Sequence, residues 1–307
     1  MVLFSKIYSS FPRNEPCPCD SGEKAKNCCL TNNEWNKIPA DINPKSPKTN
    51  LFNKNCFASV TNDCDSKITD EHYISQSVLK QINKDGNKVK IQGSSWLNDN
   101  ESKDLPTSSL VTKNLCKRHN EALSPLDSEA SRFFEILDSY NNSFKGENYS
   151  EEIKVFCGED LERWLLKTAL GILESGQLKN DGQPLKLKLP DNLIKILYGQ
   201  YNWPKGWGLH ISEETITYQS SIGCTPIVDR ELNNLIGMKF RINNFVYNLA
   251  FKLANDSRKT FGIHRPKTLV FSDGKVKKYI ELCWQDKSNQ FVVEMFRTKK
   301  NDNQALQ

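Results

Sequence analysis

Glu71 and His72 stand next to each other in the stretch ITDEHYISQS, residues 68–77, and His72 is one of four histidines in the 307-residue chain. An imidazole with an unperturbed pKa of about 6.5 can take a proton from water near neutral pH. A carboxylate can bind a hard divalent cation, and phosphodiester hydrolysis needs both functions. The pair therefore indicates either a hydrolytic centre or the charged end of an ordinary strand.

Two pairs of potential zinc ligands flank this acidic-histidine pair. Cys56 and Cys64 precede it, and Cys116 and His119 follow it with the two-residue spacing of a zinc knuckle at the start of a helix. Zinc prefers thiolate and imidazole ligands, so the two pairs can share one tetrahedral ion. A shared zinc would tie a strand pair to that helix and bring the acidic-histidine pair and Asn120 onto the same small surface.

A separate group of four cysteines lies near the N-terminus in the stretch EPCPCDSGEKAKNCCL. Four thiolates within thirteen positions, with Gly22 in the loop, can close a tetrahedral zinc site, whereas a disulfide between the adjacent Cys28 and Cys29 would be strained. The segment resembles the SEC-C motif, a small zinc-binding module appended to many bacterial proteins, although Asp20 stands where that family usually has glycine. The resemblance implies a closed structural zinc site formed by Cys17, Cys19, Cys28 and Cys29.

Residues 52–127 resemble the HNH family of nucleases, whose ββα-metal unit is often built on a zinc-bound frame. The matching residues are Glu71-His72 with a following Ile74, the Leu115-Cys116 step, and Asn120 after the second knuckle. HYISQSVLK is also similar to the corresponding stretch in the HNH domain of RNA-guided nucleases. The resemblance implies that His72 is the general base and that Glu71 and Asn120 bind a catalytic Mg²⁺ or Mn²⁺. It also implies a structural zinc on Cys56, Cys64, Cys116 and His119.

Three assignments in this segment stay open. The middle asparagine of the HNH pattern has no counterpart near Val111, so Ser109 or Asn114 could orient His72 instead. Asn120 could cap a helix rather than bind a metal ion. The whole segment could also be a zinc-stabilised treble clef that binds nucleic acid or protein without catalysis.

Charge is unevenly distributed along the chain, whose net charge is +5, because residues 209–307 hold 15 basic and 10 acidic residues. A basic segment suits a polyanion such as double-stranded DNA, since neutralised phosphates release counterions, although a solvated lysine-rich surface has the same composition. No apolar stretch approaches the roughly 20 residues of a membrane span. We therefore expect a cytoplasmic protein with no membrane partner. Its ten cysteines would be many for that compartment unless a group of them binds metal, since disulfides are rare there.

The rest of the chain predicts the elements that carry these groups. Residues 31–50 are rich in Asn, Lys and Pro and predict a linker. Apolar residues have helical spacing in SPLDSEASRFFEILDSY, in GEDLERWLLKTALGILESG up to Gly176, and in PDNLIKILYG, which starts at Pro190 and Asp191. From residue 209 on, alternation predicts about five to seven antiparallel strands, with turns at Asn243-Asn244 and at SDGK.

Two further groups of residues are predicted to be structural. Four residues on one predicted helix belong to the core: Trp164, Leu165, Leu170 and Leu173. Five thiols and imidazoles lack ligand spacing: Cys157, Cys224, Cys283, His210 and His264.

Together these features predict an α+β protein. Its expected parts are a SEC-C-like zinc module (1–30), a linker (31–50), a zinc-bound, treble-clef-like ββα-metal nuclease unit (51–127), a helical region (128–208) and a basic antiparallel β domain for recognition or docking (209–307). The leading function is metal-dependent endonucleolytic cleavage of nucleic acid, DNA rather than RNA, in restriction or phage defence. The alternative is a non-catalytic zinc adaptor that binds nucleic acid or a protein partner, through the SEC-C-like module or the C-terminal domain.

Overall fold

Two units, each discontinuous in sequence, make up the computed structural model of the protein. Unit 1 comprises residues 1–38, 135–156 and 266–307, and unit 2 comprises residues 39–134 and 157–265. The consecutive boundaries predicted from the sequence do not coincide with these units, and as functional divisions they stay predictions. The structure describes residues 11–82, 88–92, 97, 101–142, 150–175, 179–180, 183–184, 192–212, 222–229, 234–242, 245–252, 257–272, 275–286 and 291–296.

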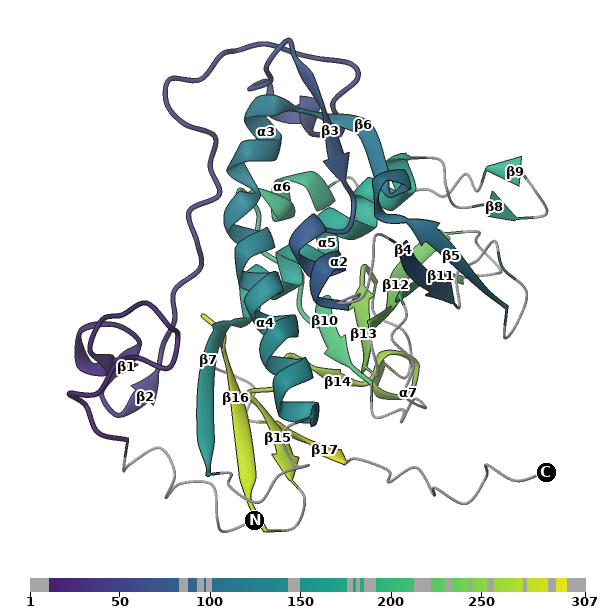
Figure 1. Ribbon diagram of the computed structural model, residues 1–307. Helices are drawn as coiled ribbons and strands as arrows, with labels where there is room; N and C mark the ends of the chain where they lie inside the picture. Colours follow the sequence, from purple (N-terminus) through teal and green to yellow (C-terminus); the bar gives the residue numbers. More distant parts are fainter. Residues whose placement is uncertain are drawn as a thin grey trace, which may run out of the picture. The chain divides into compact units, whose positions relative to one another are not determined.

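Unit 2 contains a two-stranded antiparallel ladder that leads directly into a helix. β3 (Ile68–His72) pairs with β6 (Val111–Cys116), and α3 (Lys117–Ala122) begins at the next residue (Figure 1). The register shifts between Thr69 and Glu71, because β6 accommodates one extra residue there. The Lys117 N–H donates to the Lys67 carbonyl over 2.8 Å, so the start of the helix is tied to the start of β3.

The larger sheet of unit 2 has seven strands in the order β14-β10-β13-β12-β11-β4-β5. β11 and β4 pair in parallel. The prediction that residues 209–307 form an antiparallel sheet of their own is therefore wrong, because strands from residues 88–106 complete this sheet. The strand bounds are β4 (Lys88–Gln92), β5 (Ser102–Pro106), β10 (Gly208–Ile211), β11 (Ile222–Asp229), β12 (Asn234–Ile242), β13 (Phe245–Ala250) and β14 (Ile263–His264).

Helices predicted from apolar spacing are present between these strands. α4 (Ser124–Asn142) and α5 (Gly158–Glu174) match two of the predicted segments, and α6 (Leu193–Leu197) lies within the third. The Phe134 ring of α4 packs against Trp164 of α5 and against Tyr247 of β13, with centroids 5.4 and 5.8 Å away. The predicted core residues of α5 are buried, except that Leu173 is half-buried. Two further short helices, α2 (Gln76–Ile82) and α7 (Ser257–Phe261), lie among the described residues.

Gly171 brings α5 close to the end of β3. A Cβ atom at this glycine would lie 2.8 Å from Cβ of Tyr73, closer than side-chain atoms approach one another. The segment after His72 and the helix α5 are therefore in direct contact. Because Lys167 lies one turn before Gly171 on the same helix, this contact places the Lys167 side chain beside β3.

Unit 1 is built on a four-stranded sheet in the order β17-β15-β16-β7. β15 and β17 pair in parallel, a second departure from the predicted antiparallel arrangement. The N-terminal cysteine segment packs on this sheet, since Cys17, Cys29 and Trp35 share one core with Val155 of β7 and Cys283 of β16. The bounds are η1 (Ala25–Asn27), β1 (Leu30–Thr31), β2 (Glu34–Trp35), β7 (Glu152–Cys157), β15 (Thr268–Ser272), β16 (Lys277–Cys283) and β17 (Val292–Phe296).

The predicted linker is mostly exposed but contacts the rest of the chain at a few points. β1 and β2 form a short hairpin, Ile42 is buried, and the Ala40 N–H donates to both carboxylate oxygens of Asp160 over 3.1 Å. The predicted turn at Asn243-Asn244 lies outside the described residues, as do Gly176, Pro190, Asp191 and the centre of SDGK. In the described ranges, no helix combines the length and the apolar character that a bilayer crossing requires.

Candidate metal centres and active site

Four sulfur atoms in unit 1 lie close enough together to bind one metal ion. The Sγ atoms of Cys17, Cys19, Cys28 and Cys29 are all within 4.8 Å of one another. Cys28 Sγ lies 3.4 Å from Cys19 Sγ and 3.6 Å from Cys29 Sγ. Zn–S bonds of about 2.3 Å place the corners of a tetrahedron about 3.8 Å apart. All four thiols are free of disulfides, so the set fits a structural zinc.

The conformation of the loop between these cysteine pairs accommodates Asp20, which stands where the SEC-C pattern usually has glycine. Asp20 has a φ of 60° and Gly22 a φ of 81°, in the left-handed region that favours glycine. Aspartate tolerates this conformation better than most residues. The Asp20 carboxylate also accepts a hydrogen bond from the Lys154 ammonium of β7 over 2.8 Å. Asp20 is therefore compatible with the loop and ties it to the sheet of unit 1.

The second set of donors is assembled from distant parts of unit 2. Cys56 and Cys64 flank the short helix η2 (Phe57–Thr61), Cys116 ends β6, and His119 belongs to α3. All four are buried, with ligand atoms within 4.8 Å of one another. His119 Nδ1 lies 3.1 Å from Cys116 Sγ and 3.6 Å from Cys56 Sγ. The two pairs predicted to share one ion thus meet, and their donors suit zinc.

Thr61 orients the imidazole of this second set. Its hydroxyl donates to the Ala58 carbonyl over 2.8 Å and lies 2.8 Å from His119 Nε2. Since a hydroxyl has only one proton to donate, the Nε2–H donates to Thr61 and the Nδ1 lone pair faces the sulfur atoms. This is the arrangement in which a neutral histidine binds a metal through Nδ1. The edge-on ring of Tyr198, 5.0 Å away, packs beside the imidazole.

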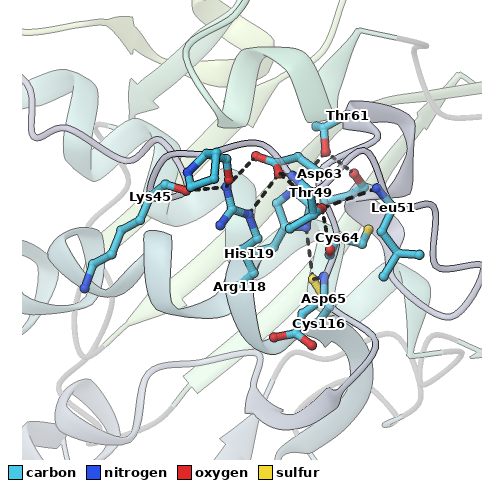
Figure 2. A network of polar contacts seen from close by, with 12 residues as sticks. Lys45, Thr49, Leu51, Thr61, Asp63, Cys64, Asp65, Cys116, Arg118 and His119 are labelled. Carbon is cyan, nitrogen blue, oxygen red and sulfur yellow. Dashed lines mark hydrogen bonds and ion pairs between the residues drawn. The ribbon is translucent and has the colours of Figure 1, made fainter.

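An ion pair between residues adjacent to the ligands joins the two halves of the second set (Figure 2). Arg118 Nε and Nη2 donate to the two carboxylate oxygens of Asp63 over 2.9 and 3.0 Å. Arg118 also donates to the Lys45 and Pro47 carbonyls, and the Thr49 N–H donates to Asp63 over 2.8 Å. We name this Asp63–Arg118 pair the clasp. Sequence reasoning missed it, because neither residue belongs to a ligand pattern.

Hydrogen bonds within each cluster favour the thiolate form of one sulfur and the thiol form of its partners. A bond with Cys29 and smaller contributions from Ser21 and other thiols lower the pKa of Cys19 to about 4. A bond with Cys56, followed by one with His119, lowers the pKa of Cys116 to about 3. The Asp65 N–H also donates to Cys116 Sγ over 3.3 Å. Each cluster therefore has one sulfur in the thiolate form that binds metal, while burial and the neighbouring thiols raise the pKa of Cys17 and Cys64.

The predicted catalytic carboxylate has a cationic partner that the sequence reasoning missed. Lys167 Nζ lies 2.5 Å from Glu71 Oε1, and 2.8 and 2.7 Å from the two oxygens of Asp127. Lys167 is 2% exposed. Burial by itself would lower the pKa of Lys167, but the Asp127 carboxylate and then Glu71 outweigh burial and raise it. The ammonium therefore stays charged between two carboxylates.

Neutral donors extend this arrangement beyond the ions. The Ser75 hydroxyl donates to Asp127 Oδ1, and the Trp164 indole N–H donates to Ser75 Oγ over 2.7 Å. One signal in the sequence was available, because Lys167 is the single charged residue within the apolar run 164–173. A charge in the middle of a buried helix needs a partner of opposite charge.

His72 lies beside this ion network and is half-buried. Burial lowers its pKa, and the Lys167 ammonium lowers it further, against the opposing effect of Asp127. The two residues that could orient His72 make their hydrogen bonds elsewhere. Ser109 donates to the Pro106 carbonyl, and Asn114 donates to the Gly171 carbonyl. The described residues make no hydrogen bond to the His72 ring.

Asn120 is brought to Glu71, as the sequence predicted. Its amide donates to Thr69 Oγ1 over 3.2 Å. Burial raises the pKa of Glu71, against the opposing effects of Lys167 and of a hydrogen bond with Asn120. The two predicted ligands of a catalytic divalent ion are therefore neighbours. However, the Glu71 carboxylate is paired with Lys167, so these residues do not form an open shell of oxygen ligands in this arrangement, and the Mg²⁺ or Mn²⁺ site stays a prediction.

The cysteines and histidines predicted to be structural lie mostly in the core. Cys157, Cys224, Cys283 and His210 are buried, and His264 is half-buried. The two histidines bind backbone carbonyls: His210 Nδ1 lies 3.1 Å from Gly208 O, and His264 Nε2 lies 2.8 Å from Trp207 O. Among the described residues, the groups with metal-binding geometry are the two clusters above.

Comparison with known families supports one of the two resemblances. The family model of the SEC-C motif matches residues 13–31, the segment that holds the Cys17, Cys19, Cys28 and Cys29 cluster. This match and the geometry of the four sulfurs together support a zinc-binding module at the N-terminal end. No curated protein and no solved structure matches the chain.

Proposed function

We propose that the protein is an HNH-type endonuclease that hydrolyses phosphodiester bonds of nucleic acid. The observation that carries this proposal is the local arrangement of unit 2. A strand ending in Glu71 and His72 pairs with the strand that leads into the helix of Asn120, and a four-donor cluster fixes the junction. This is the order of elements and groups that a ββα-metal nuclease requires.

The proposed chemistry divides between His72 and a cation. The His72 imidazole accepts a proton from the attacking water, which a neutral ring can do near pH 7. Mg²⁺ or Mn²⁺ would neutralise charge on the scissile phosphate. Glu71 can serve as its ligand only after the carboxylate separates from Lys167. Asn120 is a hydrogen-bonding neighbour of Glu71.

Three basic residues on one face of β4 and β12 support double-stranded DNA as the substrate. Ile91, Ile222 and Ile242 are aligned across three strands, and their side chains are buried. Because successive side chains alternate between faces, the residues next to this line lie on the opposite face. They include three basic residues from two distant parts of the chain, Lys88, Lys90 and Arg241, of which the two lysines are exposed. Basic side chains on one face suit a phosphate backbone, and we place the activity in restriction or phage defence.

A second candidate function is a non-catalytic zinc adaptor that binds nucleic acid or a protein partner. Two observations favour it. The SEC-C match lies in a closed cluster that offers metal-binding ligands but no open reaction site. In addition, Glu71 is paired with a buried ammonium rather than open to a metal ion.

The experiment that separates these functions is a nicking assay on purified full-length protein. Supercoiled plasmid, linear duplex DNA and single-stranded RNA are each incubated with Mg²⁺ or Mn²⁺. The nuclease proposal expects nicked or linear plasmid that disappears with EDTA. Binding in a gel-shift assay without cleavage of any substrate would support the adaptor instead.

A further inference from the structure

The Lys167 ammonium is the cation that contacts the carboxylates of the proposed active site. It contacts Glu71 from β3 and both oxygens of Asp127 from α4, over 2.5 to 2.8 Å. The three side chains come from three elements that converge in unit 2. With two carboxylates and one ammonium, the group has a net charge of one negative unit.

A divalent ion and this ammonium compete for the same carboxylate. Mg²⁺ binds carboxylate oxygens at about 2.1 Å, and the ammonium is 2.5 Å from Glu71 Oε1. Both cations on one carboxylate would lie a few ångströms apart in a buried setting, where like charges repel strongly. Each cation therefore weakens the binding of the other to this carboxylate.

We propose that Lys167 is the resident cation of the Glu71 carboxylate, and that a divalent metal ion enters the centre by displacing this ammonium onto Asp127 alone. This inference rests on the proposed function, because it concerns the metal ion that the nuclease would use. Lys167 and Asp127 are positioning residues in this scheme, since they act through Glu71. The centre is therefore closed in the described arrangement and opens as a divalent ion binds.

Asp127 is suited to retain the ammonium after Glu71 turns away. It contacts Lys167 through both carboxylate oxygens. The Ser75 hydroxyl, itself bound by the Trp164 indole, fixes one of these oxygens. The Glu71 contact, in contrast, uses one oxygen of a longer side chain. Exchange at Glu71 thus leaves the buried ammonium with a partner of opposite charge.

Binding of Mn²⁺ alone to the zinc-loaded full-length protein tests the proposal, and electron paramagnetic resonance of free Mn²⁺ reports the affinity. Lys167→Met removes the competing cation, so Mn²⁺ should bind about tenfold more tightly than in the wild type. Asp127→Asn leaves the ammonium to Glu71 alone and should weaken binding. Lys113→Met is the matched control, because it removes an exposed lysine charge from neighbouring β6. Glu71→Gln should abolish binding, so that the signal of free Mn²⁺ stays undiminished.

The direction in which Lys167→Met changes the Mn²⁺ affinity distinguishes competition by the ammonium from a purely structural role of Lys167. Unchanged or weaker Mn²⁺ binding in Lys167→Met, or no binding in either protein, overturns the proposal. If Lys167→Met does not fold, as judged by zinc content and thermal melting, the charge-balanced Lys167→Met/Asp127→Asn variant replaces it. The double variant should also bind Mn²⁺ more tightly than the wild type, and weaker binding would identify Asp127 as a metal ligand. Failure of the nuclease proposal is distinct, since it appears as absent plasmid cleavage.

Discussion

The guanidinium of Arg118 binds the carboxylate of Asp63 through two hydrogen bonds of 2.9 and 3.0 Å. Arg118 lies between the metal-ligand positions Cys116 and His119, and Asp63 directly precedes Cys64. The clasp therefore joins the two knuckles independently of a metal ion. Both side chains are largely buried, with exposures of 16% and 6%, so the pair is shielded from solvent screening.

Replacing Arg118 with leucine should destabilise unit 2 by about 3–5 kcal/mol, because it leaves the Asp63 charge buried without its partner. Urea unfolding and the rate of zinc transfer to a chelator measure the effect. Lys117→Met is the control, since the exposed Lys117–Glu121 pair at 3.6 Å contributes about 0.3–0.5 kcal/mol. Equal zinc release from the two variants would show that the clasp does not hold the knuckles together.

His72→Ala should reduce plasmid cleavage by about 10²–10⁴-fold, the usual contribution of a positioned general base. Zinc content and melting temperature should change little, because the side chain is half-buried and makes no hydrogen bond within the described residues. Asp70→Asn serves as the matched control, since Asp70 lies on the same strand with an exposed ion pair to Lys113. A His72→Ala protein as active as this control would refute the assignment of the base.

Elemental analysis should find two zinc ions per chain, one for each four-donor cluster. Cys116→Ser should lose one ion together with the folded state of the β3–β6–α3 region, since zinc binding supplies much of the folding free energy of such small units. Cys17→Ser should lose the other ion and loosen the core that contains Val155 and Cys283, while plasmid cleavage persists. One zinc in the wild-type protein would mean that one cluster does not hold zinc.

Replacing Lys88, Lys90 and Arg241 with glutamine should weaken binding to duplex DNA and flatten its dependence on salt. Each lost phosphate contact lowers the slope of log K against log salt by about 0.9. Fluorescence anisotropy at several salt concentrations measures both quantities. Deleting the basic segment 209–307 would not measure the effect of its charge. Its strands share a sheet with β4 and β5, so the deletion would disrupt unit 2.

The matched control for this charge removal replaces three exposed lysines outside the sheet, Lys48, Lys195 and Lys205. Equal changes in the two triple variants would show that DNA responds to total charge rather than to this face. An unchanged salt slope in the first variant would assign the basic residues to solvated surface, and would favour a protein partner.

The buried His210 should make stability depend on pH. Burial, and next the neighbouring His264, lower its pKa to about 4, against about 6.5 in the unfolded chain. Unfolding therefore takes up a proton between pH 6.5 and 4, and the free energy of unfolding falls by about 3 kcal/mol as the pH drops through this window. His210→Phe removes this dependence. Urea unfolding at pH 7 and pH 4.5 measures it, and equal losses in both proteins would contradict the assignment.

The sequence alone was enough to predict the members of both four-donor clusters. Ligand identity and short spacing limit which residues can surround a zinc ion, so Cys17, Cys19, Cys28 and Cys29 could be grouped without a fold. The pairing of Cys56 and Cys64 with Cys116 and His119 was predicted for the same reason, and the structure brings them within 4.8 Å. Helices α4 and α5 followed from their apolar period.

Only the tertiary structure revealed the partners of these residues. Lys167 and Asp127 belong to no motif, and their contacts with Glu71 arise because α5 packs closely on the segment after β3 at Gly171. The strands of residues 88–106 likewise join those of residues 222–250. This pairing could not be predicted, because β-strands pair through backbone hydrogen bonds, which do not depend on side-chain identity. Local patterns identify which groups can bind a metal or take a proton. The packing of distant segments determines that the Glu71 carboxylate faces a buried ammonium.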